Sequence, residues 1–590
     1  MAKNLDLKDV QLLATATALR DHRSYDEARQ LLIARIAQGL TTDDTAGLTL
    51  LANIAGLLID IGSEGKNEQA IKDGPSLLEN NRQHLVDLMT AASLDYNLGN
   101  GKIALAELRT PNPFVMPGLA DHDLLLAAKN HYWAALKATD QNDNFARMLR
   151  TNLGSALRKS GRITEALTAY DETIANDPSF TMAHFHRGLA LLVLEQLSGG
   201  RTITLLRQAA AEYAIAADAP DALPAVRETA LSMRDRTMKR LTARGHNVEQ
   251  LQHDNQETQQ EASEHSAYRQ FTLQHHLGLS EHSLYCHCRG ARRDDLMIAT
   301  SKTPVTGDRV PRLELILNRL KAEFGTARLL YYQATFEQSW DLHDHEITYA
   351  ELFEGEHISI GTELLRTSFR LCLGILDKIA LGICELYDVA DTDERLYFES
   401  FWQPPAHKAK GKAGSRWKTL TAKSKNPGLV ALYSQATDLR SDGEWALFKQ
   451  WRNALEHRFL ILTEEPTPED LWHARQGTFE TRCVTLKEFT RRTLDLLQLT
   501  RSAIFNFTYC ARHETRAKDD RLAITLTLQH KYAEPETNLP RLPRPATRES
   551  IRDSQAGRRP RPARPGRPGR GRNDNPGLNR NLQESRRELR

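Results

Sequence analysis

Three side chains close together in the sequence have the types and spacing needed for proton transfer and anion binding. Arg452 and Asn453 are neighbours, and His457 follows four residues after Asn453. Histidine titrates near neutral pH, so it can take or give a proton, as general acid–base catalysis requires. A guanidinium fork binds phosphate oxygens and stabilises negative charge that grows in a transition state. Asn453 is neutral and can orient either His457 or a bound phosphate by hydrogen bonding.

The residues around this trio have helical periodicity over 445–462. At about 100° per residue, Asn453 and His457 stack on a face roughly opposite to an apolar stripe, and Arg452 lies beside that stripe, one turn below Glu456. We therefore expect Glu456 to pair with Arg452 at the helix surface and to compete with phosphate when no substrate is bound. The stripe faces the core of the domain and consists of Phe448, Trp451, Leu455, Phe459 and Leu462.

The far side of the same helix is also partly apolar, because it carries Ala454 and Leu460. We expect this side to touch a second surface, such as a symmetry mate. A homodimer would then place two trios across one cleft.

Other long helical blocks surround this helix, at residues 313–333, 362–387, 429–439 and 486–512. Together they predict a helical bundle. Asp377 interrupts the apolar pattern of the second block, and an unpaired buried carboxylate would be costly. Its partner is either an Arg or Lys elsewhere in the bundle, or one of the two candidate catalytic residues Arg452 and His457, which it would orient.

The stretch from Arg452 to His457 resembles the signature of the HEPN superfamily, the helical domains of prokaryotic defence and toxin ribonucleases. That signature is an Arg, a polar residue that is often Asn, and a His a few residues later. The bundle is also similar to the HEPN branch found behind tetratricopeptide arrays, through the helices at residues 317–332, 368–387 and 426–441. The resemblance covers about residues 266–510, and we place the domain at 266–515.

The resemblance implies metal-independent RNA cleavage, in which the ribose 2′-hydroxyl attacks the adjacent phosphate and leaves a cyclic phosphate end. It implies that Arg452, Asn453 and His457 are catalytic, with Asp377 and Glu456 in support, and that no metal and no other cofactor is required. RNA is the expected substrate and a homodimer the expected assembly. The hypothesis is an endoribonuclease regulated through its N-terminal region in stress response or defence. The alternative is a catalytically silent scaffold for dimerisation, RNA binding or protein binding.

One segment departs from the resemblance. Residues 404–427 are basic and contain no acidic residue. They either steer RNA phosphates towards the site or form an exposed, solvated loop. The candidate RNA-binding residues there are Lys408, Lys410, Lys412, Arg416 and Lys418.

A helical repeat array is expected before this domain. Residues 147–180 carry the residues of a tetratricopeptide repeat at its characteristic offsets. A second copy begins 34 residues later, with Gly188 following Gly154, and it carries an insertion at residues 198–200 in the turn between its helices. We assign residues 1–235 to a degenerate array, which either binds a protein or peptide on its concave surface or serves as a structural arm. The first copy is marked by Leu153, Gly154, Leu157, Gly161, Ala166, Tyr170 and Pro178.

Residues 236–265 are polar and read as a linker, and a cluster of Cys and His residues follows them. Thiolates and imidazoles are zinc ligands, but the spacing here includes a C-x-C without the second pair that structural zinc sites usually have. We interpret these residues instead as a segment that packs into the domain, so we expect no metal site. The cluster comprises His275, His276, His282, Cys286, His287 and Cys288.

The composition is that of a multidomain globular protein, with 590 residues, of which 40% are hydrophobic. Six cysteines in so long a chain do not form a disulfide framework. The N-terminus lacks a signal-peptide pattern, and charges interrupt the most apolar long stretch, residues 364–387. We therefore expect a cytoplasmic protein with no membrane span.

The C-terminal 50 residues hold 15 Arg, no Lys and 5 acidic residues, although the whole chain has a net charge of only +2. Residues 558–572 are nearly all Arg, Pro and Gly, so they cannot offset the entropy of ordering by burial. We predict a disordered basic tail at 535–590, which either solubilises the chain or binds a polyanion such as RNA. The predicted architecture is thus all-α: an N-terminal repeat array, a helical bundle of HEPN type and this tail.

Overall fold

The computed structural model describes residues 5–112, 119–140, 143–200, 202–220, 222–246, 261–298, 312–337, 340–349, 356–389, 396–403, 416–423, 425–441, 443–465 and 481–518. The central part of the expected linker, the three lysines Lys408, Lys410 and Lys412, and the expected tail lie outside these residues. Within them the chain is almost entirely helical, which confirms the all-α class.

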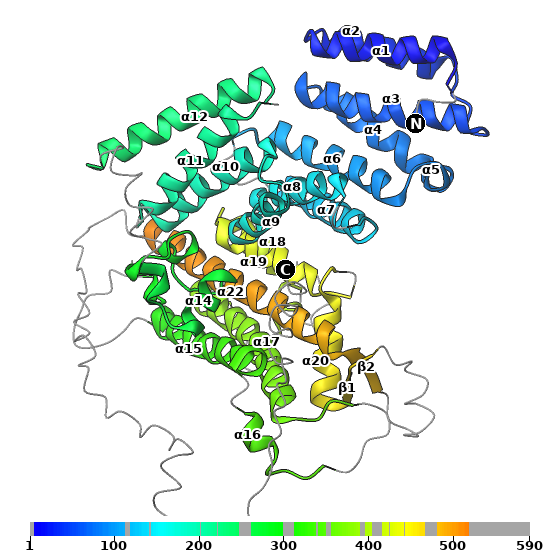
Figure 1. The fold of residues 1–590 in the computed structure, drawn as a ribbon. Helices are drawn as coiled ribbons and strands as arrows, with labels where there is room; N and C mark the ends of the chain where they lie inside the picture. The colour runs from blue at the N-terminus through cyan, green and yellow to red at the C-terminus, as the bar shows by residue number, and fades with distance from the viewer. Residues whose placement is uncertain are drawn as a thin grey trace, which may run out of the picture. The chain divides into compact units, whose positions relative to one another are not determined.

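The N-terminal half is an array of antiparallel helices in which successive helices pack together (Figure 1). Its last helix extends past residue 235 into the segment expected to be a linker. The helices are α1 (Leu7–Asp21), α2 (Tyr25–Ala37), α3 (Thr45–Glu64), α4 (Glu68–Asn80), α5 (Arg82–Leu88), α6 (Ala91–Arg109), α7 (Leu119–Lys137), α8 (Asn144–Lys159), α9 (Ile163–Asn176), α10 (Thr181–Ser198), α11 (Thr204–Asp218) and α12 (Pro224–Ala243).

The two sequence copies in the array use the same packing device. A Cβ atom at Gly154 of α8 would lie 2.6 Å from the ring of Tyr170 on α9, and a Cβ at Gly188 of α10 would lie 3.0 Å from the ring of Tyr213 on α11. Both tyrosines are fully buried. A glycine thus lets each helix pair close onto a buried tyrosine ring, and the insertion at residues 198–200 falls between α10 and α11.

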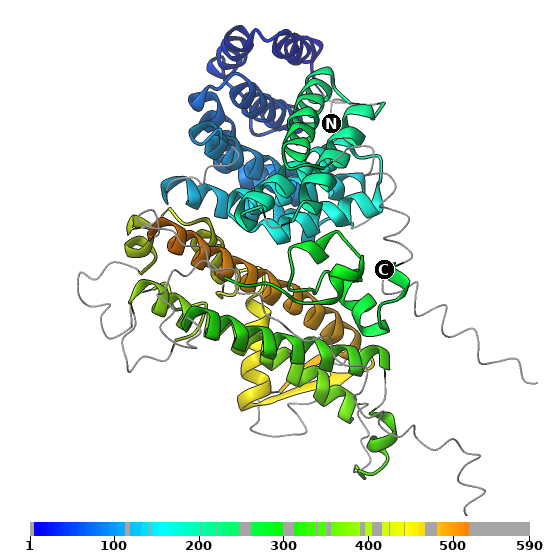
Figure 2. The ribbon, with the colours of Figure 1, turned by 90° about the vertical axis from the view of Figure 1, so that its left-hand side faces the viewer.

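The C-terminal half is a bundle built on three long helices, α15 (Arg312–Tyr332), α17 (Ile360–Tyr387) and α22 (Leu486–Lys518). Figures 1 and 2 show α22 running beside α17, with α19 on its other side. The remaining elements are α14 (Ala267–Gln274), the 3-10 turns η2 (His282–Leu284) and η3 (Arg289–Arg292), the π-helical turn η4 (Gln333–Glu337), α16 (Asp341–Asp344), α18 (Arg416–Lys423), α19 (Pro427–Asp438), α20 (Ala446–His457), β1 (Phe459–Thr463) and β2 (Thr481–Thr485).

The helix expected over residues 445–462 is shorter than predicted. α20 ends at His457, and Phe459–Thr463 forms a strand paired in parallel with β2, so that Phe459 lies opposite Thr481. Phe459 is 52% exposed rather than part of a buried helical stripe, whereas Leu460 is buried within its own chain rather than against a symmetry mate. The sequence FLILT is a short apolar run, and helical periodicity cannot distinguish such a run from a strand.

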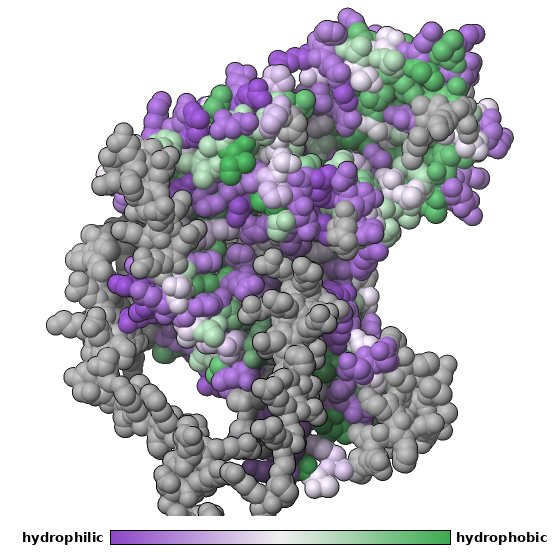
Figure 3. Space-filling view, in the orientation of Figure 1, coloured by the Kyte–Doolittle hydropathy of each residue, from purple (hydrophilic) through white to green (hydrophobic). Residues whose placement is uncertain are grey.

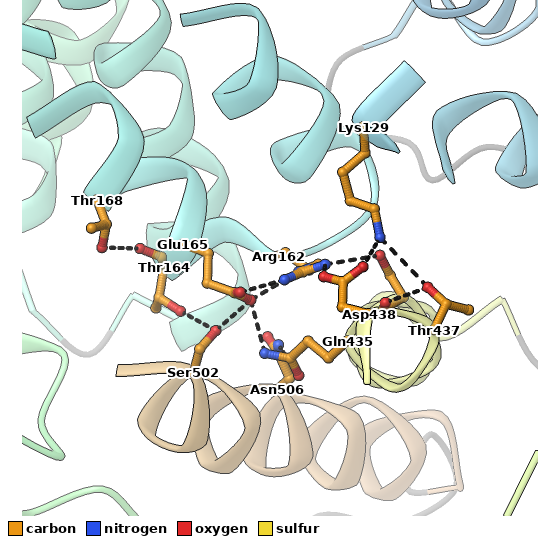
Figure 4. A network of polar contacts seen from close by, with 11 residues as sticks. Lys129, Arg162, Thr164, Glu165, Thr168, Gln435, Thr437, Asp438, Ser502 and Asn506 are labelled. Carbon is orange, nitrogen blue, oxygen red and sulfur yellow. Dashed lines mark hydrogen bonds and ion pairs between the residues drawn. The ribbon is translucent and has the colours of Figure 1, made fainter. Parts of the chain in front are cut away.

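The array and the bundle meet at a buried network of charges (Figure 4). The carboxylate of Asp438, at the end of α19, binds the ammonium group of Lys129 on α7 and, at 2.5 Å, the guanidinium of Arg162 before α9. All three side chains are about 1% exposed. Burial by itself would raise the pKa of Asp438, but Arg162 and Lys129 hold it below its ordinary value. The carboxylate therefore stays charged, and removing one partner of such a buried pair is strongly destabilising.

A second carboxylate extends this network into α22. Glu165 of α9 accepts hydrogen bonds from Arg162 at 2.9 Å, from Gln435 of α19 at 2.8 Å and from Ser502 of α22 at 2.9 Å (Figure 4). Thr164 lies 2.8 Å from the same serine. The array is thus joined to two helices of the bundle by side chains whose polar atoms face one another.

Among the described helices, α3 alone is long and apolar enough to cross a membrane, and 67% of its apolar window is buried inside the protein. Such burial is typical of a core helix. Apolar residues also gather on the surface over α1 to α5, at the upper right of Figure 3, where Leu7 is 68% exposed.

Candidate functional site

The candidate site lies where α20 packs against α17. The rings of Phe448 and Trp451 on α20 lie 5.8 and 6.0 Å from the ring of Phe369 on α17. These aromatic contacts fix the rotation of α20 about its axis. Because Arg452 follows Trp451, its side chain is directed along α17.

Arg452 is bound by the carboxylate that interrupts the apolar pattern of α17. Its Nη2 donates to Oδ2 of Asp377 at 2.9 Å, and the guanidinium lies 5.5 Å from the centre of the Tyr397 ring. The other carboxylate oxygen of Asp377 accepts the backbone N–H of Phe398 at 3.0 Å. Of the two alternatives for Asp377, the structure shows the pair with Arg452. The Arg452 side chain as a whole is 28% exposed, so it is not sealed from solvent.

Burial raises the pKa of Asp377 above its ordinary value, even though the Phe398 N–H and Arg452 both lower it. A raised carboxylate pKa means that the charged form is held less tightly than in water. On acidification, Asp377 therefore takes up a proton at a higher pH than an ordinary surface aspartate does. Its ion pair with Arg452 is lost at that higher pH.

Asn453 and His457 are exposed on α20, and His457 is the last residue of that helix. Within the part of the chain that the structure describes, neither side chain has a hydrogen bond or ion pair. Five positions correspond to about 140° around a helix, so Arg452 is turned towards α17 while His457 faces solvent. The imidazole is accessible to a substrate or to another chain.

The prediction that Glu456 pairs with Arg452 is wrong. The carboxylate of Glu456 instead lies 3.4 Å from Nε of Arg370 on α17, and Arg452 is taken by Asp377. Both side chains have a partner on α17, so the neighbouring helix takes the place of the partner that each was expected to find on the next turn of α20.

Two arginines of α17 that the sequence analysis did not single out hold the end of α20 and the start of β1. Nη2 of Arg370 donates to the carbonyl of Leu455 at 2.8 Å, and Nη2 of Arg366 donates to the carbonyl of Leu460 at 3.0 Å. Carbonyls in the last turn of a helix have no intrahelical partner, so Arg370 caps the turn that carries His457. A signal was present: Arg366, Arg370 and Asp377 are spaced by four and seven residues, which places them on one face of a helix.

The basic segment is described only in part. Arg416 donates to the carbonyl of Phe401 at 3.1 Å and lies over the Phe401 ring, so it anchors α18 to the preceding turn. Lys418 is exposed. The other three candidate RNA-binding residues, Lys408, Lys410 and Lys412, lie outside the described residues.

Among the described residues, one group of side chains could hold a metal ion, and all of it lies in the short segment from η2 to the start of η3. His282, Cys286 and Cys288 bring their ligand atoms within 4.8 Å of one another. The prediction of no metal site rested on spacing alone, and the structure places a third ligand, the imidazole of His282, beside the C-x-C pair. Of the other members of the sequence cluster, His275, His276 and His287 are not in this group.

Comparison with known proteins identifies the bundle. Residues 304–514 match the family model of LA2681-like HEPN domains. No curated protein and no solved structure matches the chain. The match begins after α14, η2 and η3, and it does not extend to the helical array, for which the tetratricopeptide assignment stays a prediction.

Proposed function

We propose, from the premise that residues 304–514 are a HEPN domain, that this chain is a metal-independent endoribonuclease that works as a dimer. HEPN domains have ribonuclease-type or nucleotide-binding functions, and they commonly dimerise and bind RNA. The observation that carries the proposal is the arrangement on α20: Arg452 is held by Asp377 at 2.9 Å, and His457 is exposed at the end of the same helix.

In the proposed reaction His457 removes the proton from a ribose 2′-hydroxyl, and the 2′-oxygen forms a bond to the adjacent phosphorus. The bond from phosphorus to the 5′-oxygen breaks, and that oxygen takes a proton. The products are a 2′,3′-cyclic phosphate and a 5′-hydroxyl. Arg452 neutralises the charge that grows on the non-bridging oxygens, while Asn453 orients the phosphate. Asp377 is a positioning residue, because it touches Arg452 rather than substrate.

A dimer would supply a second His457 as the other acid–base group. When the two proton transfers occur at the same time on opposite sides of the phosphorus, one imidazole cannot serve both, whereas two histidines across a shared cleft can act as base and acid in one step. The exposure of His457 supports this arrangement, as does that of the neighbouring Phe459, whose ring is 52% exposed. An exposed aromatic side chain beside a polar site is a typical feature of a contact surface.

The array is proposed to regulate this site through the buried charge network. The carboxylate of Asp438 binds Lys129 and Arg162 of the array, and its backbone carbonyl accepts the N–H of Trp445 at 2.8 Å, directly before α20 begins. One residue thus contacts both the array and the start of the candidate catalytic helix. A partner that displaces α7 or α9 would therefore shift α20. The biological process that we propose for this regulation is stress response or defence.

This regulatory step is tested by Lys129→Met, which removes one cation from the network. The rate of RNA cleavage is expected to change at least about threefold, because loss of Lys129 leaves the buried carboxylate of Asp438 with one partner fewer. Lys137→Met is the matched control, since Lys137 binds Glu444 but is itself 60% exposed. Equal rates for wild type and Lys129→Met would remove the support for coupling through Asp438.

The ribonuclease proposal is tested by incubating the full-length chain with total RNA and with tRNA in EDTA. Wild type is compared with His457→Ala and with His343→Ala, whose histidine is exposed on α16 of the same domain. Wild type and His343→Ala should cleave, and His457→Ala should lose at least about a hundredfold in rate. Equal cleavage by all three would contradict the role of His457. If a folded, dimeric wild type does not cleave, the silent scaffold becomes the better function.

A further inference from the structure

We propose that His282, Cys286 and Cys288 form a zinc site that fastens the segment leading into the HEPN domain to the helical array. The proposal is independent of the ribonuclease function, since none of these residues belongs to α17 or α20. It rests on the convergence of three ligand atoms, on the partners that orient the histidine, and on the space left beside the ligands.

The three ligand atoms are already close to the spacing that a tetrahedral ion requires. Nε2 of His282 lies 3.1 Å from Sγ of Cys288, and all three ligand atoms lie within 4.8 Å of one another. Zinc bonds of about 2.3 Å to sulfur and about 2.0 Å to nitrogen separate the ligand atoms by roughly 3.5–3.8 Å. An ion can therefore be held by small side-chain adjustments alone.

The local backbone explains why a spacing without a second cysteine pair still gathers three ligands. The turn η2 begins with His282, and η3 begins directly after Cys288, so two tight 3-10 turns fold the segment back on itself. Gly290 lies at the centre of this fold, where a Cβ atom would be 3.2 Å from Nε2 of His282 and 3.4 Å from Sγ of Cys288. The glycine keeps the space beside the ligand atoms open.

The array orients the histidine. Nδ1 of His282 lies 3.1 Å from the hydroxyl of Thr204, the first residue of α11, and 3.3 Å from that of Thr202, which precedes this helix. When Nδ1–H donates to a hydroxyl, the lone pair of Nε2 points at the thiols. Metal-binding histidines almost always have a partner of this kind on their other nitrogen. The threonines therefore link the proposed site to the array.

The donor set selects the ion. Two thiolates and one imidazole favour zinc over magnesium or calcium, which prefer oxygen ligands. The three side chains are half-buried, so an ion can enter and a water molecule can occupy the fourth position. Because metal binding to such ligands stabilises the folded arrangement, zinc would hold residues 282–288 against the start of α11.

The test measures the metal content of the full-length protein, purified without chelator and dialysed after zinc reconstitution. Wild type should retain one zinc ion per chain, and Cys286→Ser and Cys288→Ser should bind zinc at least about tenfold more weakly. His287→Ala is the matched control, because its imidazole lies between the two cysteines in sequence but outside the group of three. It should retain zinc as wild type does.

A second test replaces zinc with cobalt in the wild-type protein and measures its absorption spectrum. This test does not depend on the folding of any variant. The cobalt form of wild type should show thiolate-to-cobalt charge-transfer absorption together with the intense visible bands of tetrahedral cobalt. Retention of zinc by both cysteine variants, loss of zinc in His287→Ala, or a cobalt spectrum without thiolate bands would overturn the assignment. A wild-type protein that retains no zinc would overturn it as well.

Discussion

Asp377 on α17 holds the guanidinium of Arg452 on α20 at 2.9 Å with one carboxylate oxygen, and with the other it holds the backbone N–H of Phe398 at 3.0 Å. One side chain thus joins the candidate catalytic helix, the central helix of the bundle and the segment that carries Tyr397. Because Arg452 is only 28% exposed, its direction depends on this carboxylate rather than on solvent.

Asp377→Asn should lower the rate of RNA cleavage by about 10- to 100-fold, the range expected when a catalytic group is displaced by about 1 Å. The amide oxygen can still accept the Phe398 N–H, so the fold should persist. The measurement is a double-mutant cycle with Arg452→Ala. If Asp377 acts through Arg452, the effect of Asp377→Asn disappears in the Arg452→Ala background, whereas an undiminished effect would assign it a separate role.

Arg370→Ala should loosen the last turn of α20 and slow cleavage by about tenfold, because the carbonyl of Leu455 loses its cap. Hydrogen exchange of residues 453–460 should become faster while exchange in α19 stays unchanged. Arg370→Lys retains one donor and should recover part of both effects. Unchanged exchange and rate in Arg370→Ala would show that His457 does not depend on this cap.

One buried histidine should give the array stability that is lost as the pH rises through neutrality. Nδ1 of His184 lies 2.7 Å from the carboxylate of Glu212, and Nε2 lies 2.9 Å from the carbonyl of Pro178. Burial lowers the pKa of His184, but these two acceptors raise it above the usual value. The folded chain therefore binds the proton more tightly than the unfolded chain does.

This stabilisation is complete below about pH 6.5, the usual histidine pKa, and is lost as the pH rises through the higher pKa of the folded state. Protection factors from hydrogen exchange in α10 and α11, corrected for intrinsic rates, should fall between about pH 6 and pH 9. His184→Gln, which does not titrate at this position, should lack this fall, and its protection should instead rise slightly near pH 6.5, because burial lowers the pKa of His186 on the same helix to about 3. A falling profile in that variant would assign the pH dependence to another group.

Two glycine substitutions should have opposite effects. Gly154→Ala places a Cβ 2.6 Å from the buried Tyr170 ring and should destabilise α8 and α9 by about 1–3 kcal/mol. Gly325→Ala, within α15, meets nothing within 4 Å and should stabilise that helix by about 1 kcal/mol. Hydrogen exchange in α8 and α9 measures the destabilisation by Gly154→Ala, and hydrogen exchange in α15 measures the stabilisation by Gly325→Ala. Equal protection of α8 in wild type and Gly154→Ala would contradict the close packing.

Helical periodicity was sufficient to predict the array, the bundle and the long helices, because a helix must bury one face whatever its neighbours are. It failed at residues 459–463, where a short apolar run pairs with β2, more than 15 residues further along the chain. The partner of such a run lies outside any local window. The motif and its helix could therefore be predicted, but not where the helix ends.

The residues of the candidate site could be predicted from the sequence, but most of their pairwise contacts could not. The burial of Asp377 demanded a partner, and Arg452 was one of the alternatives. The pairing of Glu456 with Arg370 depends on how α17 lies against α20, which a single helix does not reveal. The same holds for His282, whose approach to Cys288 depends on two 3-10 turns that sequence spacing does not show.

The most direct test of the central claim compares two oligonucleotides of one sequence, unmodified RNA and its fully 2′-O-methylated counterpart. Both are incubated briefly in EDTA with wild type and with His457→Ala. Wild type alone is expected to cleave, only the unmodified RNA should be cut, and the fragments should end in 2′,3′-cyclic phosphates. Cleavage of the methylated strand, or cleavage of RNA by His457→Ala at the wild-type rate, would contradict the central claim.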